Sequence, residues 1–262
     1  MKGDHVLLPD VQDQPDARGI EIDEVGITGL RYPTRFDDGL MEQHVIAEFG
    51  LSVGLPAERR GTHMSRMVEI VHDHLQTLDP RQLQTVLKAM ADRLDVERAS
   101  VSAAFPVATL VPAPVTEAPA WQASDVCLAA RLSPDGSELR STAVAEVTSL
   151  CPCSKAVSDY GAHNQRSVVA LTITGEGDDP YPLPVSAAID LIRGVGSSAV
   201  YPLIKRRDER HLTMRAFDTP AFVEDIVRDL SIACRQLGLR HAVEIKNIES
   251  IHSHDVVAVI QW

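Results

Sequence analysis

Residues 219–246 read TPAFVEDIVRDLSIACRQLGLRHAVEIK, and this stretch decides the fold class. Thr219 followed by Pro220 is typical of a helix start, and Gly238 is typical of a helix end. Between them, apolar residues recur at helical spacing and predict one buried face. Residues 241–246 predict a strand directly after the turn. The predicted apolar face consists of Phe222, Ile226, Leu230, Ala233 and Leu237.

Similar elements are predicted on both sides of this stretch. The first half has strand-like segments at 43–55, 98–105 and 125–132, and helix-like segments at 62–77 and 79–94. The second half has strand-like segments at 139–149, 166–174, 241–246 and 255–261, and a further helix near 185–195. We interpret each half as two strands, two helices and two strands. This order predicts an α+β fold, in which an antiparallel sheet carries its helices on one face.

The domain organisation follows from composition. Residues 1–30 are polar and acidic and predict an irregular N-terminal arm. Residues 31–135 and 136–262 are predicted to form a first and a second module. The segment 106–119 is rich in proline and alanine, so it is predicted to be a loop or an edge, and a possible seam between the halves.

The bulk properties exclude several classes of protein. The net charge of −12 gives the chain no general affinity for nucleic acid or anionic lipid, so a polyanionic ligand would need a local basic cluster. No apolar run reaches the length of a membrane span, and no signal-peptide core follows Met1. We therefore expect a cytoplasmic protein that binds neither nucleic acid nor membrane. Its four cysteines then favour metal or thiol chemistry over a disulfide framework.

The segment SLCPCSKAVSDYGAHNQRS, residues 149–167, is the richest in chemistry. Thiolate and imidazole are donors that zinc and similar ions prefer, and Cys151 and His163 supply one of each. The alternative is a pair of buried thiols beside a turn, because Cys-x-Cys alone is weaker evidence than two Cys-x-x-Cys motifs.

A second cluster is ESIHSH, residues 249–254. If it leads into a strand, His252 and His254 point to the same face, since side chains alternate. Two imidazoles beside Glu249 suit proton transfer near neutral pH. The alternative is that these are ordinary surface histidines.

The segment KRRDER, residues 205–210, offers both signs of charge. Lys205, Arg206 and Arg207 could contact phosphates, and Asp208 or Glu209 could bind a metal. A solvated charged loop is the more common outcome for such a run.

Two helix starts carry further polar groups. Glu224 in FVED, residues 222–225, could accept two hydrogen bonds from a ligand, or be an acid favoured by the helix dipole. At GTHMSR, residues 61–66, backbone N–H groups and Arg66 suit an anion, or the segment is a capped helix with a core methionine.

The cysteine–histidine segment resembles the type IB GTP cyclohydrolases. The resemblance continues in order through almost the whole chain, in DVQ (10–12), LPAERRGTHMSRMV (55–68), LIKRRDER (203–210), TPAFVEDIVRD (219–229) and NIESIHSH (247–254). It implies the tunnelling fold, built from two tandem ββααββ-like modules around a central channel. It also implies a homotetramer with active sites at subunit interfaces.

The resemblance assigns roles by position. One divalent ion (zinc, manganese or iron(II)) is implied per site, with the ligands Cys151, His163 and Glu209. The carboxylate of Glu224 would bind the guanine edge of GTP. The catalytic group would comprise His252, His254, Glu249 and Cys153. Candidates for the triphosphate and ribose are Lys155, Arg166, Lys205, Arg206, His63, Ser65 and Arg66.

The implied reaction converts GTP and water to 7,8-dihydroneopterin triphosphate and formate, a first step towards folate and other pterins. A metal-activated water attacks guanine C8 while a histidine protonates N7, and the opened ring later recloses. The sequence departs from the family pattern at Arg193, Arg207, Met214 and Lys246. Two alternatives stay open: a tunnelling-fold enzyme acting on another purine or pterin, and a non-catalytic protein that binds a nucleotide or metal.

Overall fold

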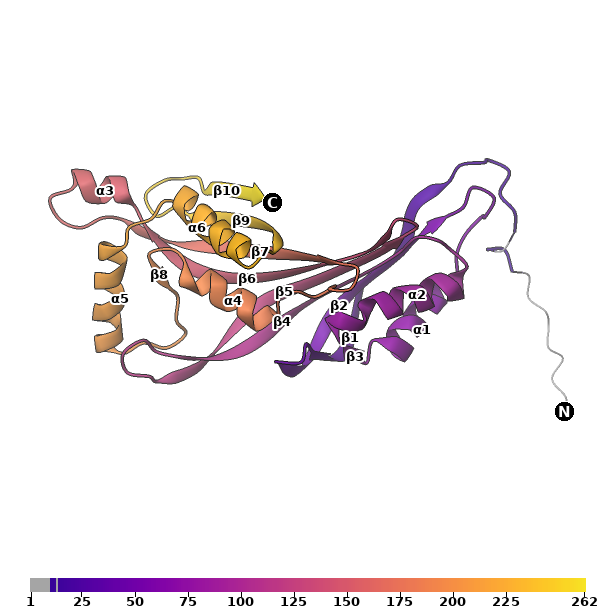
Figure 1. The fold of residues 1–262 in the computed structure, drawn as a ribbon, viewed down its shortest axis with the longest axis horizontal. Helices are drawn as coiled ribbons and strands as arrows, with labels where there is room; N and C mark the ends of the chain where they lie inside the picture. Colours follow the sequence, from indigo (N-terminus) through magenta and orange to yellow (C-terminus); the bar gives the residue numbers. More distant parts are fainter. Residues whose placement is uncertain (1–9, 13) are drawn as a thin grey trace.

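The chain forms one continuous sheet that runs the length of an elongated molecule (Figure 1). The structure is a computed structural model that describes residues 10–12 and 14–262. The strand order along the ten-stranded sheet is β10-β9-β7-β6-β5-β4-β2-β1-β3, and β8 pairs with β6 beside this path. All pairings are antiparallel except that of β1 with β3.

The elements of each half follow the predicted α+β order, with additions. The first half contains β1 (Ile22–Asp37), β2 (Glu42–Leu55), α1 (Met64–His74), β3 (Thr77–Leu78), a 3-10 turn (Pro80–Gln82), α2 (Leu83–Leu94), β4 (Ala99–Pro112) and β5 (Pro119–Ser133). The second half contains β6 (Gly136–Leu150), α3 (Pro152–Val157), β7 (Asn164–Glu176), α4 (Val185–Gly194), β8 (Ser198–Ala199), α5 (Arg206–Asp218), α6 (Val223–Gln236), β9 (Arg240–Ile248) and β10 (Val256–Gln261).

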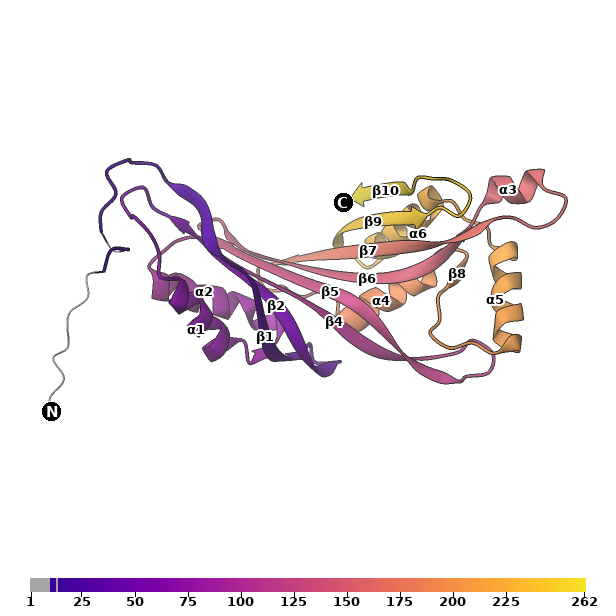
Figure 2. The same cartoon turned by 180° about the vertical axis from the view of Figure 1, so that it is seen from behind.

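Helices α1, α2, α4 and α6 cover one face of the sheet, as predicted, whereas α5 stands at its end (Figures 1 and 2). Helix α2 packs on β4 and β5, α4 on β6 and β7, and α6 on β9 and β10. In α6 the buried apolar residues are Val223, Ile226, Val227, Leu230 and Cys234. Each such side chain stabilises the fold by roughly 1.5–3 kcal/mol through burial. The predicted stripe was right at its centre and wrong at its ends, because Phe222 and Leu237 are exposed.

The prediction of an irregular arm over residues 1–30 is wrong from Ile22 onward, where β1 begins. This strand carries register shifts between Ile22 and Val25 and between Ile27 and Leu30. A Cβ atom at Gly26 would lie 1.8 Å from the carbonyl oxygen of Leu51, so only glycine fits this close approach. The bulges and glycines disrupt the alternation of apolar and polar residues by which a strand is predicted from sequence. Residues 1–9 and 13 of the predicted arm lie outside the described residues.

The prediction for residues 106–119, a loop or an edge and a seam, is right only in part: β4 from Pro106 to Pro112 is an edge on the side of β2, but the segment is neither a loop throughout nor a seam. Strand β4 continues to Pro112, and β5 starts at Pro119, leaving a tight hairpin turn. Pro106 is tolerated because β2 pairs with β4 only as far as Ala104. The N–H of Ala108, two residues further, points to that unpaired side and bonds the side chain of Gln43 at 2.9 Å. The missing N–H of Pro106 therefore costs no ladder hydrogen bond.

Three further details differ from the predictions. Helix α6 starts at Val223, and Thr219 ends α5 instead of capping α6, through its N–H to the Arg215 carbonyl at 2.9 Å. The charged run 205–210 is the first part of α5, not a loop. This helix buries only Asp208 and Ala216, so it lacks the apolar stripe by which a helix is predicted.

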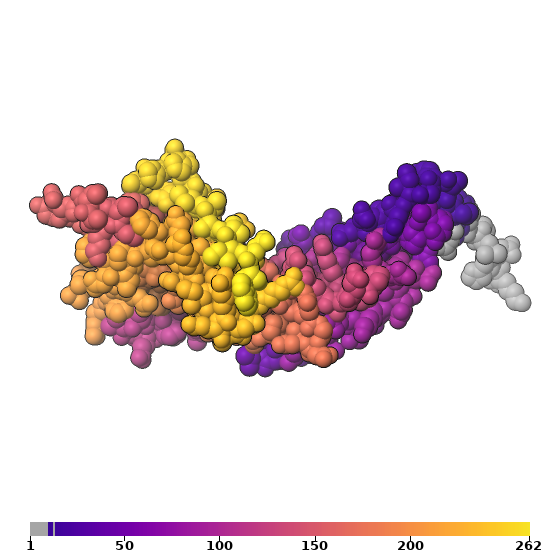
Figure 3. Space-filling model, turned by 45° about the horizontal axis from the view of Figure 1, so that its top comes forward, coloured from indigo at the N-terminus to yellow at the C-terminus, as the bar shows by residue number. Residues whose placement is uncertain are grey.

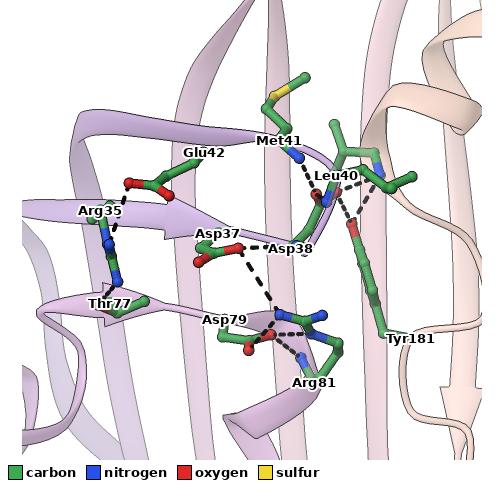
Figure 4. A network of polar contacts seen from close by, with 12 residues as sticks. Arg35, Asp37, Asp38, Leu40, Met41, Glu42, Thr77, Asp79, Arg81 and Tyr181 are labelled. Carbon is green, nitrogen blue, oxygen red and sulfur yellow. Dashed lines mark hydrogen bonds and ion pairs between the residues drawn. The ribbon is translucent and has the colours of Figure 1, made fainter.

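The two halves are tied together by a buried carboxylate (Figure 4). Asp38, in the β1–β2 turn, accepts hydrogen bonds from the N–H groups of Leu40 and Met41 at 3.0 and 2.8 Å. Its other oxygen accepts from the Tyr181 hydroxyl at 3.0 Å and the Val185 N–H at 3.2 Å. The turn of the first half therefore anchors the start of α4 in the second half.

The predicted boundary between residues 135 and 136 falls in the β5–β6 turn. The sheet continues without a break across it, so the division into two modules stays a prediction. None of the helices that the structure describes is long and apolar enough to cross a membrane.

Candidate active site

The cysteine–histidine segment lies at one end of the sheet, where β6 ends and β7 begins. Cys151 is the N-cap of α3, and Pro152 occupies the first helical position. The Cys151 N–H donates to the His163 carbonyl at 3.0 Å, and the His163 N–H donates to the Ser154 hydroxyl at 3.3 Å. These bonds close the loop between β6 and β7 and hold the thiol and the imidazole on neighbouring backbone. Figure 3 shows this segment projecting from the molecule.

Two side-chain hydrogen bonds through Gln165 connect His163 to the ESIHSH segment. The His163 Nδ1 atom lies 2.8 Å from Oε1 of Gln165, and Gln165 Nε2 donates to Oε1 of Glu249 at 3.2 Å. The hydroxyl of Ser250 lies 3.5 Å from the same Nδ1. Gln165 is 8% exposed, so both of its amide contacts are made within the protein. The structure therefore joins a predicted metal ligand to a predicted catalytic acid.

A buried polar network underlies this corner and positions the start of α6. The Ser149 hydroxyl donates to the Ala221 carbonyl at 2.8 Å, and the Ala221 N–H donates to the Leu150 carbonyl at 3.1 Å. Asn247 donates to Ser149 at 3.2 Å and accepts from Ser167 at 2.5 Å. These bonds fix the chain just before Cys151 against the chain just before α6.

Glu224 lies in the first turn of α6, next to this anchored corner. Its side chain is exposed, as a ligand-binding carboxylate requires, and the helix N-terminus favours its negative charge.

His252 and His254 lie side by side in the loop between β9 and β10. Their rings stack with centroids 5.2 Å apart and planes inclined by 20°. Both side chains are exposed. The two side chains were predicted to share one face of a strand; they do lie together, but in a loop, because β9 ends at Ile248 and β10 begins only at Val256.

Helix α5 positions Glu209 through its buried neighbour Asp208. The Asp208 carboxylate accepts from the Val115 and Thr116 N–H groups at 2.8 and 2.9 Å, and from the Thr116 hydroxyl at 2.6 Å. It also accepts from the Lys205 N–H at 2.9 Å. Burial alone would raise the pKa of Asp208, but these hydrogen bonds outweigh it and hold that pKa well below its usual range. Glu209 is exposed beside this clamp.

Several predicted phosphate contacts are already engaged. The Lys155 ammonium donates to the Phe217 carbonyl and lies 4.2 Å from the centroid of the Phe217 ring. Arg166 lies 3.5 Å from Glu146, on the sheet face opposite to Gln165. Lys205 and Arg206 are exposed at the start of α5. An exposed ion pair such as Arg166–Glu146 contributes little to stability, so Arg166 can readily leave Glu146 to contact a ligand.

The remaining candidates for the triphosphate and ribose lie in another part of the molecule. His63, Ser65 and Arg66 are at the start of α1, at the opposite end of the molecule from α3 (Figures 1 and 2). His63 bonds Asp10 at 2.8 Å, and Gln12 donates to the Thr62 carbonyl at 2.7 Å. The DVQ and GTH segments therefore meet in space. One chain does not bring this group to Cys151.

The donors suit a metal ion only in part. Thiolate and imidazole lie together at Cys151 and His163, and Gln165 leaves Nε2 of the imidazole free for a ligand bond. Across residues 10–12 and 14–262, however, no three His, Cys, Asp or Glu side chains are close enough to hold an ion. Within the described residues of one chain, the structure does not group Glu209 with Cys151 and His163, the other two predicted ligands.

Two of the departures from the family pattern, Lys246 and Arg193, make defined contacts. Lys246 lies 2.8 Å from Asp255, the residue directly after His254. The hydrogen bond from Lys246 lowers the pKa of Asp255 below its ordinary value. Arg193 donates to Gln122 at 2.7 Å and lies over the Tyr201 ring, so it links α4 to β5 and to the segment after β8. Nothing in the structure explains Arg207 or Met214.

A cavity of about 760 Å³ lies at the other strand ends and contains no predicted site residue. Its charged lining is mostly paired, as in Arg131 with Glu24 at 3.6 Å and Glu138 with Arg140 at 2.7 Å. The candidate site is therefore the exposed corner around Cys151.

Comparison with known proteins identifies the family. Residues 8–258 match the family described as type I GTP cyclohydrolase FolE2. The chain belongs to this family. It is 40% identical to GTP cyclohydrolase FolE2 of Bordetella avium over 98% of its length and 97% of the relative's. It is also 40% identical to GTP cyclohydrolase FolE2 of Nitrosococcus oceani, over 97% and 95% of the two chains. The family prediction is confirmed, although the name type IB is narrower than this description.

The fold prediction is confirmed by solved structures. The FolE2 chain resembles the urate oxidase of Bacillus sp. TB-90 with a TM-score of 0.51 and 11% identity, over 92% of this chain and all of that one. A hyper-thermostable uricase also gives a TM-score of 0.51, at 8% identity. At such identity the likeness concerns the fold alone, which is the tunnelling fold.

Sequence reasoning missed the residues that support this FolE2 site. Gln165 and Ser167 follow His163 at alternate positions of β7, so strand periodicity could have placed them on the same face. Ser149 and Asn247 begin the segments 149–167 and 247–254 that carry the family resemblance, but their residue types alone indicate no role.

Proposed function

We propose that this chain is a GTP cyclohydrolase that converts GTP and water to 7,8-dihydroneopterin triphosphate and formate, at the entry to folate and pterin synthesis in the cytoplasm. The narrower name type IB belongs to the same proposal. One observation carries it: at the ends of β6, β7 and β9, the Cys151 backbone bonds that of His163, and Gln165 links the His163 imidazole to the Glu249 carboxylate. The match to a family of GTP cyclohydrolases supports this reaction, and so do the thiol, imidazole and carboxylate groups around Cys151.

The exposed side chains suit recognition of guanine. The carboxylate of Glu224 can accept hydrogen bonds from N1–H and the exocyclic amino group together, which are adjacent donors on one edge of the base. The helix dipole favours its ionised form. Glu224 is therefore proposed to fix the base with C8 towards the Cys151 corner.

The stacked histidines suit proton transfer. The reaction needs protons delivered to N7 and removed from water in one pocket, and imidazole does both near neutral pH. His252 and His254 are exposed and adjacent, so a ligand can reach both. Glu249 is held by Gln165 at the edge of this group. Cys153 is exposed on α3 and is kept as a catalytic candidate.

The metal belongs to the proposal. Cys151 and His163 would hold one divalent ion, zinc, manganese or iron(II), with Glu209 as a third ligand supplied on assembly. When bound, such an ion supplies a Lewis acid that lowers the pKa of water. The mixed donor set does not itself select among the three ions.

The homotetramer is proposed because a single chain separates the candidate residues. Helix α1, whose start carries His63 and Arg66, lies at one end of the sheet, and α3, which Cys151 caps, lies at the other (Figure 1). A phosphate site that includes both sets needs a second copy of the chain, and closed symmetry is the usual form of such assemblies. Lys155, Arg166, Lys205 and Arg206 would add positive charge from the Cys151 end.

The test is GTP turnover by metal-stripped protein with zinc, manganese or iron(II) added back. Formate and the fluorescence of the oxidised pterin are followed together. Appearance of both, dependent on metal, supports the proposal and ranks the metals. Binding of GTP and metal without formate would favour a non-catalytic protein, or one that acts on another purine.

A further inference from the structure

We propose that Gln165 is a positioning residue that fixes which ring nitrogen of His163 faces the metal position and that holds Glu249 against the same corner. The metal part of this inference rests on the proposed function, while the tautomer part concerns the protein alone. The observation that carries it is the chain from Nδ1 of His163 through the Gln165 amide to Oε1 of Glu249, at 2.8 and 3.2 Å.

The orientation of the amide follows from what each neighbour can do. A carboxylate oxygen only accepts hydrogen bonds, so the NH₂ group of Gln165 must face Glu249. The carbonyl oxygen Oε1 must then face His163. Because that oxygen only accepts, Nδ1 of His163 must carry the proton. The Ser250 hydroxyl, at 3.5 Å from Nδ1, is free to rotate and does not oppose this assignment.

The fixed tautomer has a chemical consequence. With its proton on Nδ1, neutral His163 presents the Nε2 lone pair as its only donor to a cation. Metal-ligating histidines are commonly oriented in this way by a hydrogen bond from the other ring nitrogen. Gln165 therefore prepares the imidazole before any ion arrives.

Gln165 is suited to this role because its backbone is immobilised. Gln165 of β7 pairs with Ser149 of β6, and its side chain is buried. The amide is also directional, since one end accepts and the other donates. Its two functions can therefore be separated by substitution.

Two variants separate the contact of Gln165 with His163 from its contact with Glu249. Gln165→Leu removes both contacts. Gln165→Glu keeps an acceptor for Nδ1–H but sets two carboxylates against each other at Glu249, which disfavours the native arrangement of that acid. Gln43→Leu is the matched control, because Gln43 also bonds through both ends of its amide, to Ala108 in the first half of the chain.

The first readout is the His163 tautomer, measured by long-range ¹H–¹⁵N NMR on metal-free, ¹⁵N-histidine-labelled full-length protein. The signal is assigned by its loss in His163→Gln. We expect the Nδ1–H form in wild type, Gln43→Leu and Gln165→Glu, and a mixture of tautomers in Gln165→Leu. An unchanged tautomer in Gln165→Leu overturns the proposal. If this variant does not fold, loss of the Nδ1–H form in Gln165→Glu overturns it instead.

The second readout is Zn²⁺ affinity, measured by competition with a chromophoric chelator in the absence of GTP. Gln165→Leu should bind Zn²⁺ roughly 10–100-fold more weakly, as loss of such an orienting partner does elsewhere. Gln165→Glu should stay within about threefold of wild type, yet lose GTP turnover at least about tenfold, because Glu249 is displaced. Unchanged Zn²⁺ affinity in Gln165→Leu contradicts the metal part. A wild type without turnover, but with the expected tautomers, would refute the proposed function and leave the tautomer assignment standing.

Discussion

The carboxylate of Asp38 accepts a hydrogen bond from the Tyr181 hydroxyl at 3.0 Å, although 143 residues separate the two in sequence. Burial and the neighbouring charge of Asp38 raise the pKa of Tyr181, so its hydroxyl stays protonated and donates. This pair joins the turn of one half of the chain to a helix of the other.

Removal of this contact should weaken the whole fold. Tyr181→Phe should lower the free energy of unfolding by roughly 1.5–3 kcal/mol, the usual contribution of a hydrogen bond to a charged group. Asp38→Ala should cost more, because it removes the acceptor of the Tyr181 hydroxyl and also the acceptor that the Leu40 and Met41 N–H groups share. Urea unfolding measures both. Glu42→Gln, which alters an exposed pair with Arg35, is the control, and an equal loss in it would show that Asp38 has no special part.

The ligand assignment predicts two classes of variant. Cys151→Ala and His163→Ala should lose bound metal and GTP turnover together. His252→Ala should keep the metal and lose turnover by at least about 100-fold, the usual range for a proton-transfer group. Metal content by mass spectrometry and formate release measure the two properties. Full metal content and full turnover in Cys151→Ala would show that the ligand set is wrong.

Sites shared between subunits predict complementation. Cys151→Ala and Arg66→Ala should each be inactive as homo-oligomers. After unfolding together and refolding as a random mixture, about a quarter of the sites should combine intact halves from two subunits. GTP turnover of the mixture, compared with each variant treated alone, is the measurement. No recovery, in a mixture shown by mass spectrometry to contain hybrids, would mean that Arg66 and Cys151 do not share a site.

The clamp at Asp208 predicts a local effect. Asp208→Ala should release the β4–β5 turn, because the N–H groups of Val115 and Thr116 lose their acceptor. Hydrogen exchange at these two amides should accelerate at least about tenfold, while the buried strands keep their protection. Thr116→Val is the milder variant, since it removes only the hydroxyl donor. Unchanged exchange in Asp208→Ala would contradict the clamp.

The contact of Lys246 with Asp255 predicts a titration change. The hydrogen bond from Lys246 lowers the pKa of Asp255, so its stabilising effect is present above the ordinary carboxyl range and is lost as the pH falls through the lowered pKa. Lys246→Ala should raise this pKa towards its ordinary value. Carboxyl ¹³C NMR titration measures it. A pKa that does not move would assign the shift to another neighbour.

Much of the fold was predictable where local signals agree with tertiary structure. Asp79 before Pro80 was predicted to start a helix, and its side chain does accept from the Arg81 N–H at 2.9 Å. The signals failed where tertiary contacts decide. Strand β1 tolerates Gly26 because Leu51 passes close to it, and α5 is a helix although its apolar face is minimal.

The candidate site was predictable in part for a similar reason. Cys151, His163 and Glu249 are reactive residue types, and the structure brings them to one corner. Gln165, the residue that joins two of them, is chemically inert, so only its contacts reveal its part. No sequence pattern could show that Arg66 lies at the far end of the same chain, because that depends on the course of the sheet.

The buried carboxylates of Asp38 and Asp208 determine whether the two halves of the chain can be produced separately. Asp38 in the first half is bonded by Tyr181 and Val185 of the second, and Asp208 in the second half is bonded by Val115 and Thr116 of the first. A chain cut after Asp135 and produced as separate polypeptides would leave each fragment with a buried acid that lacks its donors from the other half. The halves are thus interdependent, and truncation to the half that carries Cys151 would not yield a minimal enzyme.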